Sequence, residues 1–174
     1  MPHTLCVVSR HQAPYVDKPV DGGFREFALA LYSAEGVSRA ALGLQDRKGV
    51  DVNVLLFAAY LATRGSRAVT RDDIETARRV VGPWQDDVVM PLRAVRRRLA
   101  AAGPKGAELS ATVHDAELAA EFIELDDLAV LAGARGSGGD VRAALHTAVE
   151  VYAGAEPDQL DLADIAVLVK GAGG

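Results

Sequence analysis

Residues 44–57 read LQDRKGVDVNVLLF and join a polar segment directly to the most apolar part of the chain. Gly49 suits the left-handed residue that follows a helix end, and two basic residues precede it, where they favour the negative end of that helix. Asp51 is a natural N-cap for the next helix. That helix, over residues 52–63, is apolar nearly all round, which is typical of an element buried on several sides. We therefore expect it at the centre of the fold.

The amides and carboxylates of this stretch must be hydrogen-bonded if they are buried, because an unpaired polar group in a core costs free energy. In a structural interpretation, which we favour, Asp51 caps the helix and Asn53 bonds to nearby backbone. Asp46 then pairs with an arginine, such as Arg25 or Arg47. In a functional interpretation the same groups line a pocket, where carboxylates bind an amine or a metal, amides orient a ligand and two aromatic residues add walls. The residues of this pocket would be Gln45, Asp46, Asp51, Asn53, Tyr60 and Trp84.

Helical spacing of apolar residues begins at Phe24 and continues at positions 27, 28 and 31. Ala, Val and Leu supply most of the apolar content and aromatic residues make up only 5%, which favours close-packed helices over sheets. We predict an all-α fold, a single compact bundle of about six to eight helices with an irregular N-terminal arm over residues 1–23. The helical core domain would span residues 24–135. A glycine hinge and C-terminal helices, packed on the core, would occupy residues 136–174.

Several local signals set the expected helix boundaries. Thr70 suits the N-cap of a helix whose first turn carries acidic residues. Gly82-Pro83 is predicted to end that helix and to begin the next one, which Pro91 should bend. Further helices are expected over residues 107–132, 140–152 and 158–169. Residues 165–169 also fit a strand, because a short apolar run has no distinguishing period.

Composition excludes several classes of function. The net charge of -5 argues against nonspecific nucleic-acid binding, which needs a basic surface. Cys6 is the only cysteine and cannot form an intramolecular disulfide, which suits a reducing compartment. The N-terminal sequence does not read as a secretory signal, and no run of about 20 apolar residues is present to cross a bilayer. We therefore expect a cytoplasmic protein with no membrane association.

Two charged clusters have both a functional and a structural interpretation. Arg93, Arg96 and Arg97 would bind a phosphate, an RNA segment or an acidic partner if they formed one patch, since arginine makes forked bonds to such anions. We favour the alternative, in which they form the solvated back of a helix. The packed seam of that helix would consist of Val88, Leu92, Val95 and Leu99.

Acidic residues follow the same pattern further along. His114, Glu117, Glu121 and Glu124 share one helix face. Metal sites in helical bundles draw such residues from several facing helices, and no second helix carries a matching set. We therefore interpret the row as a solvated stripe.

No pattern of catalysis or metal binding stands out. His3, Cys6 and His11 are too few for a structural zinc site, which needs four ligands. No serine lies in a G-x-S-x-G elbow, and the glycines at 136–139 lack the lysine of a phosphate loop. We expect no metal site, and the sequence identifies neither a cofactor nor a catalytic residue.

The order and spacing of several segments resemble a proteobacterial family of small conserved hypothetical proteins that is defined only as a domain of unknown function. The resemblance is carried by FREFALALY at 24–32, by L-Q-D-x-x-G-V-D-V-N-x-L-L-F at 44–57, by Pro83-Trp84 and by VVMPLR at 88–93. It is strong over residues 24–99 and weaker over 116–125. It implies a helical cytoplasmic protein and supplies no activity.

Two functions from different classes remain open. We favour a non-enzymatic protein-protein interaction or adaptor module, which binds a protein partner beside the basic helix or through the apolar segment after the glycines. The alternative is a small-molecule or metal-binding helical protein, or an enzyme, with a carboxylate and amide pocket around Asp46, Asp51 and Asn53.

Overall fold

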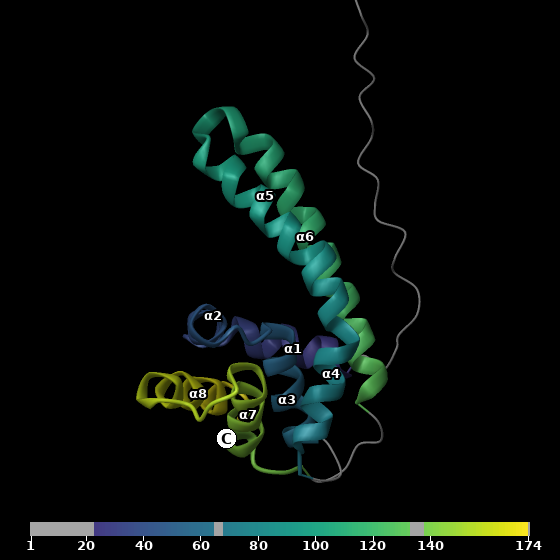
Figure 1. The fold of residues 1–174 in the computed structure, drawn as a ribbon, viewed down its shortest axis with the longest axis vertical. Coiled ribbons are helices and arrows are strands. Elements are labelled where there is room, and N and C mark those ends of the chain that lie inside the picture. Colours follow the sequence, from purple (N-terminus) through teal and green to yellow (C-terminus); the bar gives the residue numbers. More distant parts are fainter. Residues whose placement is uncertain (1–22, 65–67, 133–137, 174) are drawn as a thin grey trace, which may run out of the picture.

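The computed structural model describes residues 23–64, 68–132 and 138–173, and helices are the only regular structure in these ranges (Figure 1). The all-α prediction is confirmed. The arm expected over residues 1–23 lies outside the described residues, except for Gly23. In chain order the elements are α1 (Gly23–Ser33), α2 (Val37–Lys48), α3 (Val52–Arg64), α4 (Arg71–Trp84), a π-helical turn (Gln85–Val89), α5 (Met90–Ala101), a 3-10 turn (Gly103–Gly106), α6 (Ala107–Leu131), α7 (Val141–Ala153) and α8 (Gln159–Gly171).

Helix α3 is the centre of the body, as expected. Eight of its 13 residues are buried, and it contacts α1, α2, α4, α6 and α7. Phe24 of α1 packs against it, with its ring centroid 5.4 Å from that of Phe57 and 5.2 Å from that of Tyr60. Each fully buried side chain of this size stabilises the fold by roughly 2–3 kcal/mol.

The junction between α2 and α3 forms as its sequence predicts. Gly49 adopts φ 69°, in the left-handed region, and its N–H donates to the Gln45 carbonyl at 2.8 Å. Asp51 Oδ1 accepts from the Val54 N–H at 3.1 Å and so caps α3. Two consecutive turns therefore place the polar residues of this stretch beside the start of the buried helix.

The expected break at Gly82-Pro83 is wrong. Helix α4 begins at the predicted Thr70 cap but continues through Pro83 and passes into the π-helical turn, in which the Met90 N–H donates to the carbonyl of Gln85, five residues back. The wide turn lies immediately before Pro91, where we expected a bend. Because a π turn shifts the hydrogen-bond register, it accommodates a proline, which has no N–H to donate.

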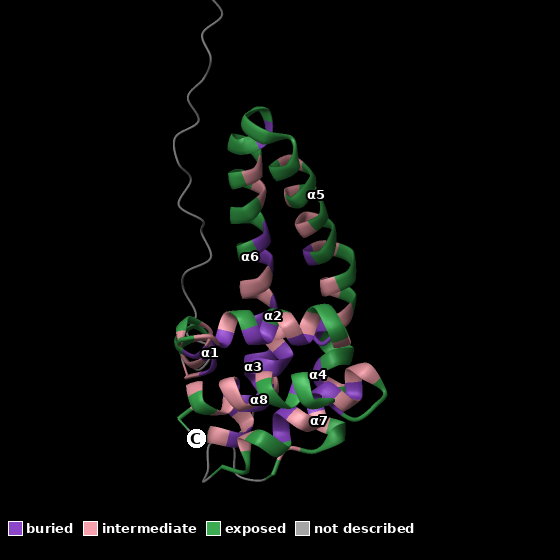
Figure 2. Cartoon of the chain, turned by 90° about the vertical axis from the view of Figure 1, so that its left-hand side faces the viewer, coloured by how far each residue is buried: buried purple, intermediate pink, exposed green. Residues whose placement is uncertain are grey.

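Helices α5 and α6 form a long hairpin that projects from the body (Figures 1 and 2). The 3-10 turn between them is tight: a Cβ on Gly106 would lie 2.2 Å from the Leu99 carbonyl oxygen. The predicted apolar seam of α5 forms only in part: Leu92 and Leu99 are half-buried, but Val95 is 44% exposed. Arg93 and Arg96 face α6 instead, where both pair with Glu117.

The C-terminal helices pack on the body, α7 against α3 and α8 against α2. Both begin where the sequence predicts, and the ambiguous run 165–169 is helical. Asp161 of α8 is fully buried and accepts from Lys48 Nζ at 2.9 Å and from Arg47 Nε at 3.1 Å. These contacts fasten α8 to the last turn of α2. None of the described helices has the length and apolar character required to cross a membrane.

Candidate functional site

A cavity of about 110 Å³ lies where the α5–α6 hairpin meets α1, α2 and the start of α3. Polar side chains from separate parts of the chain line one side of it. Leu29, Leu42 and Leu118 also line it and are 49%, 42% and 39% exposed, so they form an apolar rim toward solvent. The polar lining consists of Tyr32, Gln45, Asp51, Asn53, Gln85, Arg93, Glu121 and Glu124.

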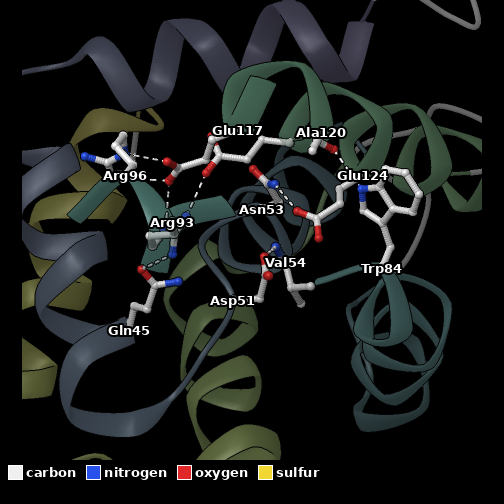
Figure 3. A network of polar contacts seen from close by, with 11 residues as sticks. Gln45, Asp51, Asn53, Val54, Trp84, Arg93, Arg96, Glu117, Ala120 and Glu124 are labelled. Carbon is white, nitrogen blue, oxygen red and sulfur yellow. Dashed lines mark hydrogen bonds and ion pairs between the residues drawn. The ribbon is translucent and has the colours of Figure 1, made fainter. Parts of the chain in front are cut away.

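Glu124 of α6 is the most buried charged group in this lining, at 1% exposure. Its Oε2 accepts from Asn53 Nδ2 at 2.7 Å, while its Oε1 is buried without a hydrogen-bond partner among the described residues. Figure 3 shows this second oxygen pointing away from Asn53. Gln85 Oε1 is likewise buried without a partner. The cavity wall therefore holds two unpaired buried oxygens. Each costs the fold about 1–3 kcal/mol while it stays unpaired.

Burial disfavours the ionised form of two neighbouring carboxyl groups in the lining, Asp51 and Glu124. Burial and then the neighbouring Asp51 raise the pKa of Glu124 to about 8. Burial also raises the pKa of Asp51, although the N–H groups of Val54 and Asn53 oppose the shift. At neutral pH the pair therefore carries fewer than two negative charges.

The other charged groups of the site neutralise one another. Arg93 donates to Glu117 Oε1 at 2.9 Å, to Glu121 Oε1 at 2.7 Å and to Gln45 Oε1 at 3.2 Å (Figure 3). Arg96 also pairs with Glu117, which is only 3% exposed. Burial opposes ionisation of Glu117, but the hydrogen bonds from Arg96 and Arg93 outweigh it and lower its pKa. This ionic seam explains why the arginines of α5 face α6.

A family model described as "Protein of unknown function (DUF2390)" matches residues 24–128. The chain belongs to this family. The DUF2390 match begins in α1 and ends near the end of α6, so it includes every residue that lines the cavity, whereas α7 and α8 lie beyond it. It confirms the predicted resemblance at the level of a domain of unknown function. A search of curated proteins found no match, and a search of solved structures found none either.

Within the DUF2390 region, four of the nine predicted pocket and anion-binding residues line the cavity and the other five do not. The cavity lining contains Gln45, Asp51, Asn53 and Arg93. Asp46 is exposed and does not line it. Neither expected partner of Asp46 pairs with it: Arg25 binds Asp126 at 2.7 Å, and Arg47 binds the carboxylates of α8.

Neither of the two aromatic residues predicted as pocket walls lines this cavity. Tyr60 belongs to the aromatic core beside Phe24 and Phe27. Trp84 donates from Nε1 to the Ala120 carbonyl at 3.1 Å and packs on α6 (Figure 3). Tyr32 lines the cavity instead.

The interpretation of residues 114–124 as a solvated stripe is wrong for its two buried acids. His114 is exposed, but Glu117 and Glu124 are buried, as is Ala120 between them. The signal was present in the sequence, because the acids recur at helical spacing with Ala120 and Leu128 and so share the buried face of α6. Glu124 was thereby missed as a site residue, as was Gln85.

The predicted anion site at Arg93, Arg96 and Arg97 stays untested. The charges of Arg93 and Arg96 are already paired with carboxylates of α6, while Arg97 is exposed. The histidines and the cysteine of the N-terminal arm lie outside the described residues.

One group of potential metal ligands occurs among the described residues. His146 Nε2 lies 3.2 Å from Glu156 and Nδ1 lies 3.6 Å from Glu150. Both ring nitrogens thus face carboxylates at the protein surface, and Glu156 is 76% exposed.

Proposed function

We propose that this protein binds a small molecule in the cavity between the α5–α6 hairpin and the body. The observation that supports this most directly is a pair of buried oxygens on the wall of one cavity, Glu124 Oε1 and Gln85 Oε1, which have no hydrogen-bond partner in the part of the chain that the structure describes. Buried polar groups in folded proteins are normally hydrogen-bonded, and exceptions need an explanation. A bound molecule that donates to both acceptors supplies one.

The shape of the lining supports the same function. Ligand sites combine apolar walls with a few convergent polar groups, which fix orientation. Here the exposed leucines 29, 42 and 118 stand at the rim and the polar groups lie deeper. The rim would admit a ligand and the interior would orient it.

The adaptor function stays a prediction with less support. Its two expected docking elements are occupied: the basic helix pairs Arg93 and Arg96 with α6, and the C-terminal segment packs on α2 and α3. We therefore place the small-molecule function first.

A blocked rim tests this proposal. Leu118→Trp places a large side chain at the rim, and Leu109→Trp makes the same change at a 55% exposed position on the same helix, far from the cavity lining. A library of small cations, anions and neutral molecules is screened by saturation-transfer NMR. We expect at least one chemical class to bind the wild type and L109W but not L118W. If the rim substitution changes the binding of no compound, the proposal is wrong.

A further inference from the structure

We infer that the ligand is an organic cation, with an ammonium or guanidinium head bound by Glu124 and Gln85 and a short apolar chain directed toward the leucine rim. This inference rests on the proposed function and names the ligand class of that same cavity. Three features of the described residues support it: the balance of charge, the kind of free hydrogen-bonding atom and the size of the space.

The charge balance favours a cation. Arg93 and Arg96 pair with Glu117 and Glu121, so two positive groups offset two carboxylates. Asp51 and Glu124 remain, and neither forms an ion pair within the part of the chain that the structure describes. A buried carboxylate without a counterion is strongly disfavoured. A positive ligand head supplies a counterion for this pair, whereas an anion would add negative charge beside two acids that burial already keeps from full ionisation.

The buried hydrogen-bonding atoms favour a ligand that donates. The Asn53 amide donates to Glu124 Oε2, and the Arg93 guanidinium donates to three oxygens. The buried atoms that remain on the wall are both oxygens, Glu124 Oε1 and Gln85 Oε1. A head with at least two N–H groups, such as an ammonium or a guanidinium, matches them.

The volume limits the enclosed part of the ligand. A protein cavity of about 150 Å³ holds benzene, with its six non-hydrogen atoms, so by proportion 110 Å³ accommodates about four. The nitrogen and the first three carbons of a four-carbon primary amine fit this space. Any longer chain would extend past Leu29 and Leu118, whose exposed apolar surface suits it.

Binding of a cation would also release a proton. Glu124 faces Asp51 from the start of α3, Arg93 from α5 and Glu121 from its own helix, and the Tyr152 ring of α7 also lies near it. With the pKa of Glu124 at about 8, a permanently charged ligand must displace the proton to form the ion pair. Its affinity should rise about 50-fold between pH 6 and pH 8, as the ionised fraction of Glu124 rises.

Isothermal titration of the full chain with four probes tests the inference. The probes are n-butylammonium and n-propylguanidinium as cations, n-butanol as a neutral isostere and butyrate as an anion. At pH 7.5 we expect both cations to bind at least tenfold more tightly than n-butanol, and butyrate not to bind. Glu124→Gln should weaken cation binding at least tenfold and reduce its pH dependence to that of Asp51, while leaving the Asn53 contact intact.

The matched control is Glu108→Gln, an exposed glutamate on the same helix, which should bind both cations as the wild type does. If n-butanol or butyrate binds as tightly as n-butylammonium and L118W abolishes that binding, the cavity is a ligand site but the cation inference is wrong. If E124Q binds n-butylammonium with wild-type affinity, the inference is also wrong. If none of the four probes binds and the wider screen also finds no rim-sensitive ligand, the proposed function falls with it.

Discussion

Glu124→Gln should make the protein more stable near neutral pH. In the folded chain the pKa of Glu124 is raised from its usual 4.5 to about 8, chiefly by burial and then by Asp51. Below about pH 4.5 the group is protonated in both the folded and the unfolded state, so it has no effect on stability. Between 4.5 and 8 the unfolded chain ionises and the folded chain does not, so the free energy of unfolding falls as pH rises.

The expected magnitude is large. Titration of Glu124 lowers the free energy of unfolding by about 1.4 kcal/mol per pH unit across that window. The total loss at pH 8 is at most about 5 kcal/mol. Glutamine cannot ionise, and its carbonyl oxygen still accepts from Asn53. The stability of E124Q should therefore exceed that of the wild type by several kcal/mol at pH 8, and the two should converge near pH 4.5.

Urea unfolding followed by circular dichroism, at pH 5, 6, 7 and 8, measures this difference. Glu108→Gln, the exposed control on α6, should track the wild type at every pH. Only the difference between variant and wild type is interpreted, because Asp51 titrates in the same direction. Parallel curves for E124Q and the wild type would refute the reasoning, since they would mean that Glu124 ionises normally in the folded chain.

Three further perturbations test the fold around the site. Glu117→Gln replaces the carboxylate that Arg93 and Arg96 share with a neutral amide and should lower the free energy of unfolding by about 3 kcal/mol at pH 7. The effect should be smaller below pH 4, because the pKa of Glu117 is lowered in the fold and its contribution disappears as the group protonates. Gly82→Ala should stabilise by about 0.5–1 kcal/mol, since the position is helical and open, whereas Gly49→Ala should destabilise by about 1 kcal/mol, since φ there is 69°. Asp161→Asn removes the charge that binds the end of α2, and hydrogen exchange should show faster opening of α8, with a loss of about 3 kcal/mol in global stability. Unfolding in urea checks the first two, and unchanged exchange in α8 would contradict the third.

Signals that lie within a few consecutive residues predicted the structure well. Gly49, Asp51 and Thr70 mark helix ends because a glycine in the left-handed region or a short side chain that accepts from the next turn acts locally. The apolar run of α3 predicted its central place for a similar reason, because a helix without a polar face must be covered on all sides. The helix break predicted at Pro83 was wrong, because a proline is only a local signal. The chain there continues into the π-helical turn, which packs against α6.

The site depended on pairs far apart in the sequence. Arg93 meets Gln45 across 48 positions, and Asn53 meets Glu124 across 71. The sequence shows which residues are polar, but it does not show which helix will lie opposite. A row of glutamates on α6 is therefore equally compatible with solvent and with an arginine-bearing neighbour. Arg93 and Arg96 of α5 favour the second arrangement, because they pair with Glu117 and Glu121. Glutamates that we predicted to face solvent therefore belong to the ionic seam between α5 and α6.

The structural role of residues 44–57 and the binding role that we propose for them involve the same side chains. Asp51 caps α3 and also lines the cavity, and Asn53 holds Glu124 while it borders the same space. Whether its polar atoms are hydrogen-bonded distinguishes a structural residue from a binding residue. The Arg93–Glu117 pair is fully hydrogen-bonded, as a structural ion pair should be. Glu124 Oε1, in contrast, has no partner among the described residues. An apolar side chain at this position would avoid the free-energy cost of an unpaired buried oxygen. A buried acid that weakens the fold and faces a cavity is more readily explained by a ligand than by packing.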